Sequence, residues 1–317
     1  MLIFKYLSPE GITHVFRRRG EVSLRFALPR DYNDPYELFL QTDKPLRSKK
    51  HRAFYKYFLG KIKQFPVTCF SKRPDSVAMW AHYGRDAAGV CLAFDEDDLA
   101  DKFPSAFVGD VKYLEGPAQI PAWKVVYAYT TEKNRHSEWL LNDAYGLAYF
   151  AKRSEWQYES ERRLIVDPKA LKHSNGILLA KLPRRVLRYI IVGPQAQDSI
   201  RQLCRRRASE YRVPLLELRI GKTRYKPFFS TASGDVMTWN VKGFRKSSEV
   251  CISCGEPARV NAGALCRWCA IEPSEVAEAA TRSLMTIALD LGVTSLVEVG
   301  FTGAKQKGWR VRRARRS

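Results

Sequence analysis

Four cysteines near the end of this 317-residue chain form two Cys-x-x-Cys pairs: Cys251 with Cys254, and Cys266 with Cys269. A two-residue gap lets both thiolates of a pair face one tetrahedral ion, which is how structural zinc is bound. Gly255, directly after the first pair, can turn the backbone around a metal. The pattern predicts a zinc-binding module over residues 251–269. Four thiols in an ordinary core, or two disulfides, are the alternatives.

A second candidate cluster lies in residues 156–166, where two carboxylates alternate with arginines. In an extended chain, Glu159, Glu161 and Arg163 share one face. This arrangement indicates either a salt-bridge ladder or a site that uses a carboxylate. Asp31 and Asp34 lie in an earlier turn, whose side chains can bond nearby backbone amides. Together with the two glutamates they leave open a magnesium-dependent nuclease, and a calcium loop is a weaker alternative.

A third cluster spans residues 69–94. It contains Phe70 and Ser71 at the end of an apolar run, followed by Trp80, His82 and Tyr83 at helical spacing. The spacing predicts that Trp80 anchors a core and that His82 points away from it. A histidine in this position is either a hydrogen-bonded structural residue or a base.

These clusters, taken in order, resemble the bacterial family catalogued as domain of unknown function 2971. The resemblance covers residues 1 to about 229 and brings no established activity. It is carried by the segments Phe4-Lys5-Tyr6, Asn33-Asp34-Pro35-Tyr36-Glu37, Cys69-Phe70-Ser71, Met79-Trp80-Ala81-His82-Tyr83, Gly89-Val90-Cys91, the run from Trp156 to Arg163, and Ile190-Ile191-Val192-Gly193-Pro194. The family pattern often begins Tyr-Lys-Tyr-Arg, whereas this chain has Leu7 in place of the arginine. The cysteine module lies outside the resemblance.

The layout is also similar to that of ADP-ribosyltransferases that use NAD. The similarity rests on an N-terminal strand with aromatic residues, a middle strand ending in Phe70-Ser71, and a late glutamate in a Tyr-Glu-x-Glu-x-Arg context. It implies that Glu161 orients the ribose and that Ser71 supports it. His82 is a further candidate catalytic residue. The residues implied to bind NAD are Tyr6, Phe70, Trp80 and Tyr83.

The elements that must position these residues follow from hydrophobic periodicity. Strands are predicted at 4–7, 24–27, 67–70, 90–94, 108–113, 162–166, 177–182, 187–192 and 214–218. Helices are predicted at 9–19, 48–65, 74–83, 139–153 and 198–211. Because strands outnumber what regular strand–helix alternation would give, we expect an α+β fold with a curved mixed or antiparallel sheet and flanking helices.

Composition divides the chain into five parts. These are an α+β domain at 1–229, a linker at 230–250, the zinc-ribbon-like module at 251–269, an amphipathic helix with a short extension at 270–300, and a basic tail at 301–317. The apolar residues that define the helix recur at helical spacing from Val276 to Leu291. This helix is a candidate contact surface for a protein partner.

A net charge of +21 favours polyanionic partners, with nucleic acid first. The tail carries Trp309 among arginines, a mixture suited to phosphate contact and base stacking. Internal basic runs such as 49–52 are most simply solvated faces. We see no signal peptide and no membrane span, and we expect a cytoplasmic protein. The sequence therefore supports two functions: an ADP-ribosyltransferase-like enzyme acting on or near nucleic acid, and a non-enzymatic protein that docks on nucleic acid through the zinc module and tail. A protein–protein adaptor is the third possibility.

Overall fold

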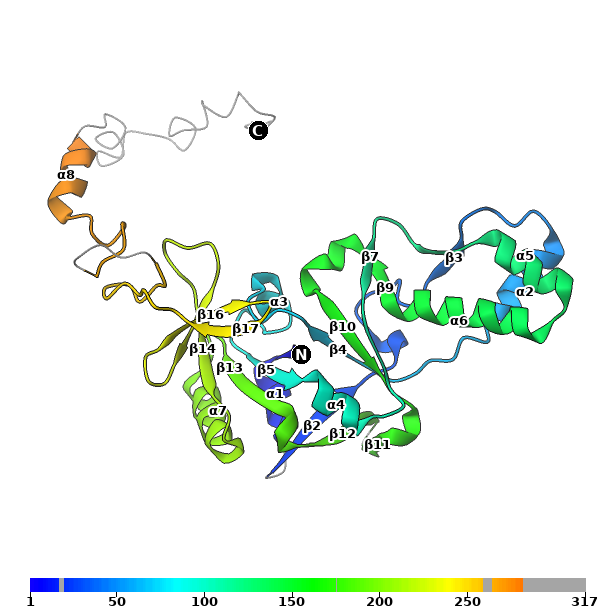
Figure 1. Cartoon of the computed structure of the whole chain (residues 1–317), viewed down its shortest axis with the longest axis horizontal. Coiled ribbons are helices and arrows are strands. Elements are labelled where there is room, and N and C mark those ends of the chain that lie inside the picture. The colour runs from blue at the N-terminus through cyan, green and yellow to red at the C-terminus, as the bar shows by residue number, and fades with distance from the viewer. Residues whose placement is uncertain (17–19, 175, 259–263, 282–317) are drawn as a thin grey trace, which may run out of the picture. The chain divides into compact units, whose positions relative to one another are not determined.

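The computed structural model describes all residues except 17–19, 175, 259–263 and 282–317. The chain divides into two compact units, Met1–Ser247 and Ser248–Ser317 (Figure 1). The first unit contains every predicted catalytic and NAD-binding residue, and the second contains the four cysteines.

A mixed sheet of ten strands forms the centre of the first unit, so the α+β prediction is confirmed. From one edge to the other its strands are β17 (Gly243–Lys246), β16 (Val236–Asn240), β15 (Phe228–Thr231), β14 (Leu215–Arg219), β13 (Leu187–Val192), β5 (Val90–Asp95), β1 (Leu2–Leu7), β4 (Val67–Ser71), β10 (Glu161–Ile165) and β6 (Phe107–Asp110). Neighbouring strands run antiparallel except β13 and β14, which are parallel. The chain reaches β10 after a long segment outside this sheet. The next strand of the sheet along the chain, β13, lies on the other side of β1 from β10.

Three smaller sheets surround this one. They are β11 (Lys172–Ser174), β12 (Ile177–Pro183) and β2 (Glu21–Phe26) in an antiparallel group, the parallel pair β3 (Leu40–Thr42) and β8 (Ala118–Ile120), and the parallel pair β7 (Lys112–Leu114) and β9 (Ala151–Arg153). All nine predicted strands overlap observed ones. The three-residue strands β3, β8, β9 and β11 were not predicted, because three residues carry too little periodicity, and the strand predicted at 108–113 covers parts of both β6 and β7.

The helices cover the sheets and build a separate helical group. They are α1 (Pro9–Val15), α2 (Lys49–Leu59), α3 (Val77–His82), α4 (Glu96–Lys102), α5 (Ala122–Thr131), α6 (Asn134–Phe150), α7 (Asp198–Tyr211) and α8 (Pro273–Thr281), with 3-10 turns at η1 (Pro29–Asp31), η2 (Ser154–Glu159), η3 (Pro168–Ala170) and η4 (Arg184–Val186). Figure 1 shows α2, α5 and α6 side by side, joined to the sheet through β9 and β3. The five predicted helices correspond to α1, α2, α3, α6 and α7, whereas α4 and α5 were not predicted.

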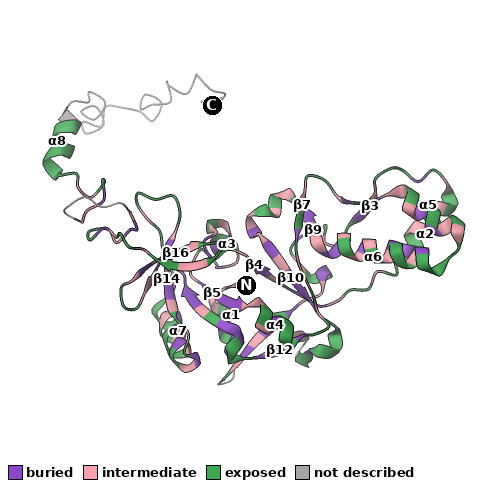
Figure 2. Cartoon of the chain, viewed as in Figure 1, coloured by how far each residue is buried: buried purple, intermediate pink, exposed green. Residues whose placement is uncertain are grey.

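Both faces of the central strands are buried, whereas the edge strands β6 and β17 are partly exposed. In β5, the residues from Val90 to Phe94 are all buried, as expected for a central strand with neighbours on both sides and layers above and below. In β1 the alternation sends Phe4 and Tyr6 to one core and Ile3 to another. Figure 2 shows these buried strands in purple at the centre of the unit.

The predicted linker at 230–250 needs correction, because strands β16 and β17 and the end of β15 occupy most of it. These strands extend the main sheet, and Trp239 and Phe244 pack on Phe4 with ring centroids 4.9 and 6.3 Å apart. The segment is mostly polar and contains two glycines, and this composition masks the few aromatic residues that pack. The first unit therefore ends at Ser247 and not near residue 229.

Within the described residues, no helix combines the length and apolar character that a membrane crossing requires. The predicted C-terminal helix is represented by α8 up to Thr281. The rest of that helix and the basic tail at 301–317 lie outside the described residues.

Candidate functional site

A cavity of about 540 Å³ opens in the main sheet where β1 and β4 separate. These two neighbouring strands pair at one position, Phe4 with Ser71, whereas β1 pairs with β5 along its full length. Side chains from β1, β2, β4, η1, α3, η2 and β10 line the opening. The volume falls within the range of small-molecule sites, which is about 300–1,000 Å³.

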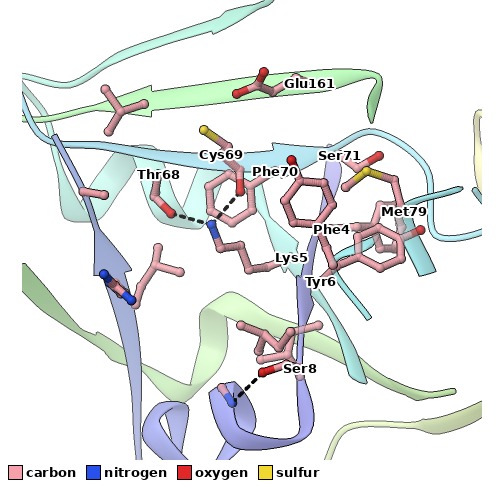
Figure 3. A pocket seen from close by; sticks show the side chains of 18 of the residues that line it. Phe4, Lys5, Tyr6, Ser8, Thr68, Cys69, Phe70, Ser71, Met79 and Glu161 are labelled. Carbon is pink, nitrogen blue, oxygen red and sulfur yellow. Dashed lines mark hydrogen bonds between the residues drawn. The ribbon is translucent and has the colours of Figure 1, made fainter. Parts of the chain in front are cut away.

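Lys5 occupies the gap between the two strands (Figure 3). Its Nζ donates to the carbonyl oxygen of Cys69 at 2.8 Å and to Thr68 Oγ1 at 3.1 Å, so it satisfies a β4 carbonyl at the place where the ladder stops. Burial lowers the pKa of Lys5. An ammonium group has three donors, so two bonds to the protein leave one for a ligand.

Three neighbouring strands bring three of the predicted segments together. Glu161 in β10 lies opposite Ser71 in β4, and Ser71 lies opposite Phe4 in β1. Residues that are opposite in an antiparallel pair have side chains on the same face. All three line the cavity, and Figure 3 shows Glu161 on the strand beside Cys69 and Ser71.

Glu161 is almost fully buried and held by two cations. Arg163 Nε donates to its Oε1 at 2.8 Å, and Lys152 Nζ lies 3.4 Å from its Oε2. Burial by itself would raise the pKa of Glu161, but the charges of Arg163 and Lys152 outweigh that effect and lower the pKa to about 2. Glu161 is thus an ionised carboxylate in a dry setting, and Arg163 is itself anchored by Glu37 and by the carbonyl oxygen of Tyr149.

Glu159, two residues earlier, has a different electrostatic character. It accepts from Lys152 Nζ at 2.7 Å and from the Tyr83 hydroxyl at 2.5 Å. Burial raises the pKa of this carboxyl group. Ser160, between the two glutamates, has a φ of 45°, and this left-handed residue separates the turn η2 from strand β10. The predicted carboxylate pair is therefore both a salt-bridge network and part of the cavity wall.

Six of the seven predicted catalytic and NAD-binding residues line this cavity: Tyr6, Phe70, Ser71, His82, Tyr83 and Glu161. His82 is exposed, whereas Tyr6, Phe70 and Ser71 are buried. Trp80 is the exception, because it is 2% exposed and packs edge-on behind Tyr6, with its Nε1 donating to the carbonyl oxygen of Pro74. As Trp80 does not reach the cavity, its predicted cofactor contact is corrected to a core role.

Sequence reasoning missed Lys5 and Lys152 as members of the site. Lys152 is buried between the two glutamates and lies nine residues before Glu161 in sequence, so no strand or helix spacing links them. Lys5 was noticed only as part of a motif. A lysine inside an apolar strand, such as Phe4-Lys5-Tyr6, is the signal that could have found it, because such a residue needs a buried partner.

The acidic turn does not form a metal site in the described part of the chain. Asp34 accepts from the backbone N–H of Tyr36, which stabilises the turn as predicted. The carboxylates of Asp31 and Asp34 do not converge with those of Glu159 and Glu161 on a shared ion position. Asn33 contributes to the cavity wall by donating to the Tyr83 hydroxyl at 3.1 Å.

The four cysteines of the second unit form a group that could hold a metal ion. Their sulfur atoms all lie within 4.8 Å of one another, and those of Cys254 and Cys266 are 3.9 Å apart. Four sulfurs placed 2.3 Å from one tetrahedral ion are about 3.8 Å apart, so the spacing fits. All seven cysteines of the chain are described, and none forms a disulfide.

The loops around this group are shaped for thiolate ligands. Gly255 has a φ of 71°, which gives the turn after the first pair. The backbone N–H groups of Cys266 and Cys269 donate to the sulfurs of Cys251 and Cys266. Backbone amides of Cys254 and Cys266 lower the pKa of Cys251 to about 6, whereas burial raises the pKa of Cys254 to about 12.

Comparison with known proteins gives one family. The model of "Protein of unknown function (DUF2971)" matches residues 79–164, which run from within α3 through β5 and α6 into β10 and include Glu161. The matched range is shorter than the expected 1–229 and leaves out the cysteine group. Neither the curated proteins nor the solved structures contain a match to this chain.

Proposed function

We propose that the cavity of the first unit binds NAD and that the chain transfers ADP-ribose from it to an acceptor. The observation that carries the proposal is the alignment of Phe4, Ser71 and Glu161 across β1, β4 and β10 at the edge of one cavity. The similarity to ADP-ribosyltransferases rested on these three segments, which are far apart in sequence. Their convergence around an opening in the sheet is the arrangement that the chemistry needs.

Glu161 has the properties of the residue that holds the ribose. It is ionised, its two oxygens are oriented by Arg163 and Lys152, and it is buried, so that its fixed charge acts strongly. Such a carboxylate accepts hydrogen bonds from ribose hydroxyls. It also stabilises the positive charge that develops on the ribose as the bond to nicotinamide breaks.

The remaining parts of NAD have matching groups in the cavity wall. The third donor of Lys5 suits a pyrophosphate oxygen, since charge-assisted hydrogen bonds of a half-buried ammonium group are strong. Tyr6 and Tyr83 supply aromatic surfaces for the nicotinamide ring. Ser71 lies opposite Glu161 and supports the same ribose. His82 is exposed, which places it beside the outer part of the ligand.

The reaction then balances without a further reactant. The bond from the ribose C1′ to nicotinamide breaks, and nicotinamide leaves as a neutral molecule with the electron pair. A nucleophile of the acceptor attacks C1′ and releases a proton. Glu159 is the candidate base, because burial raises its pKa and because it already accepts a hydrogen bond from the Tyr83 hydroxyl.

Calorimetry with NAD and chromatographic detection of released nicotinamide test the proposal. We expect the full chain to bind NAD, and we expect Glu161→Gln to reduce nicotinamide release by about 100-fold or more. Glu155→Gln is the matched control, since Glu155 lies in the same turn as Glu159 but is exposed and paired with Arg153. A folded wild-type chain that neither binds NAD nor releases nicotinamide would rule out this function.

His82→Ala provides a second variant that keeps the fold intact. The side chain is exposed, and its nearest ring, that of Tyr158, lies 5.6 Å away. If His82 contacts the ligand, the substitution weakens NAD binding or nicotinamide release without changing the melting temperature. This result separates a loss of chemistry from a loss of structure.

We also propose that the four cysteines hold zinc. The sulfur spacing supports a tetrahedral ion, and four thiolates favour zinc over calcium or magnesium. A loop of this size buries little apolar surface, so the ion would supply most of its stability. We assign the zinc a structural role, because four protein ligands leave no position for a substrate.

A further inference from the structure

Helix α2 and its flanking turns form the most one-sided charge cluster of the first unit. Residues 44–63 contain eight Lys or Arg residues and no Asp or Glu. The eight cations are Lys44, Arg47, Lys49, Lys50, Arg52, Lys56, Lys61 and Lys63. All of them are exposed, and none lies within salt-bridge distance of a carboxylate in the described part of the chain.

Three of these cations lie on one face of the helix itself. Residues three and four apart are neighbours on a helix, so Lys49, Lys56, Lys50 and Tyr57 surround Ala53 on the outer side. The opposite side carries Phe58, which is 5% exposed and belongs to the core shared with α5 and α6. We call the outer side, with Lys61 at its end, the cationic face.

An aromatic ring lies within the cationic face. Tyr57 is 63% exposed, and Lys61 Nζ lies 4.9 Å from the centre of its ring. An exposed tyrosine beside lysines offers a flat surface for a nucleobase and cations for the adjoining phosphates. Ala53, at the centre of the cationic face, has a small side chain that projects less far than the lysines around it.

The requirements of the helix do not explain this pattern. The first turn contains Lys49 and Lys50 and no acidic residue, although the positive end of a helix dipole favours acidic residues there. Like charges at helical spacing also repel one another. A face that served only as a solvated surface would gain from mixed charges, whereas a polyanionic ligand would relieve the repulsion.

We propose that the cationic face binds single-stranded nucleic acid, with phosphates on Lys49, Lys50 and Lys56 and a base stacked on Tyr57. A lipid surface fits less well, because a membrane-binding helix buries its apolar side in the bilayer. The apolar side of α2 is already packed in the core. The face consists of residues of the first unit alone, and binding to it requires neither NAD nor the metal.

Fluorescence anisotropy of the full chain with labelled oligo-dT and oligo-rU, measured over a range of NaCl concentrations without NAD, tests the proposal. The variant Lys49→Gln, Lys50→Gln, Lys56→Gln should reduce the slope of log affinity against log salt by about two units, at roughly 0.7 per phosphate contact. The control variant Lys102→Gln, Lys169→Gln, Lys172→Gln removes the same charge at exposed positions elsewhere and should keep the wild-type slope.

A second pair of variants tests the stacking. Tyr57→Ala should weaken binding by roughly tenfold. Trp139→Ala should leave it unchanged, since Trp139 is 60% exposed on the neighbouring helix α6 but has no place in the cationic face. Equal losses in the two lysine variants, equal losses in the two aromatic variants, or binding to phosphatidylserine vesicles in preference to both oligonucleotides would each overturn the proposal.

Discussion

Glu161 and Ser71 face each other across the antiparallel pair β10–β4, and both side chains line one cavity. One of the two is an ionised carboxylate and the other a buried hydroxyl. They are 90 residues apart in sequence, so the strand register determines whether they form a site. The site therefore depends on the groups that hold this register and its charges in place.

The acid stability of the first unit should depend on Glu161. Its pKa is about 2 in the folded chain against an ordinary value of 4.5, so it contributes stability above pH 4.5 that is lost as pH falls toward 2. Glu161→Gln should remove this dependence and lower the free energy of unfolding at pH 7 by about 3–5 kcal/mol, because Arg163 and Lys152 lose a buried partner. Urea unfolding between pH 2 and pH 7 measures both effects, with Glu155→Gln expected to match the wild type.

Glu159 should change the pH dependence of stability in the direction opposite to Glu161. Burial raises its pKa, so the folded chain binds this proton more tightly than the unfolded chain does. Its contribution to stability is therefore present at low pH and is lost as pH rises through the folded pKa. Glu159→Gln should flatten this part of the pH profile and keep the hydrogen bond with Tyr83. A variant with the same pH profile as the wild type would contradict the raised pKa.

Lys5 should stabilise the separation of β1 and β4. Lys5→Met keeps most of the side-chain volume but leaves the carbonyl oxygen of Cys69 without its donor, at a cost of about 1–3 kcal/mol. The same variant should weaken NAD binding if the cavity takes a pyrophosphate. Thermal unfolding and calorimetry give the two readouts separately. A melting temperature equal to that of the wild type would show that another donor replaces the ammonium group.

Gly89 should tolerate no side chain. A Cβ at this position would lie 2.1 Å from the carbonyl oxygen of Leu7, a backbone atom of strand β1. Gly89→Ala should therefore destabilise the chain by about 3 kcal/mol or more. Gly146→Ala is the matched control, because it lies within α6 with open space around it and should stabilise the helix by about 0.5–1 kcal/mol. Chemical denaturation compares the two, and equal midpoints would be the contrary result.

Removal of metal should affect the second unit alone. We expect about one zinc per chain by elemental analysis, because the four sulfurs surround one position. A chelator, or the variant Cys254→Ser, should release it and increase proteolysis between residues 248 and 281. The thermal transition of the first unit should stay the same. A metal-free preparation with unchanged protease resistance would show that the loop folds without an ion.

The sequence was informative where packing is local. Val90 to Phe94 form an unbroken apolar run, and this run is a buried central strand. The cysteine spacing likewise indicated a shared ion position. It was less informative where contacts are distant: Trp239 and Phe244 lie in a polar segment, and only their packing on Phe4 shows that the segment belongs to the sheet.

The candidate site was predictable in part for the same reason. Tyr6, Tyr83 and Glu161 belong to recognisable sequence motifs, and the strand register brings these aromatic and acidic residues together around the cavity. The parallel pairing of β9 with β7 places Lys152 at the site, and no local sequence pattern indicates this pairing. Trp80 lies in the predicted helix, but its side chain is in the core and not at the cavity, and its indole N–H donates to the carbonyl oxygen of Pro74.

The separation of β1 from β4 also has a mechanical consequence. The ten-stranded order consists of seven strands from β17 to β1 and three strands from β4 to β6. Between β1 and β4, one backbone pair, Phe4 with Ser71, and the side-chain bonds of Lys5 to Thr68 and Cys69 join the two groups. Each group keeps its own hydrogen-bond ladder whatever the distance between them. A small hinge movement at Phe4 and Ser71 would widen or narrow the cavity at the expense of very few backbone hydrogen bonds. Such a hinge movement within the sheet would admit a ligand to the cavity without a separate lid.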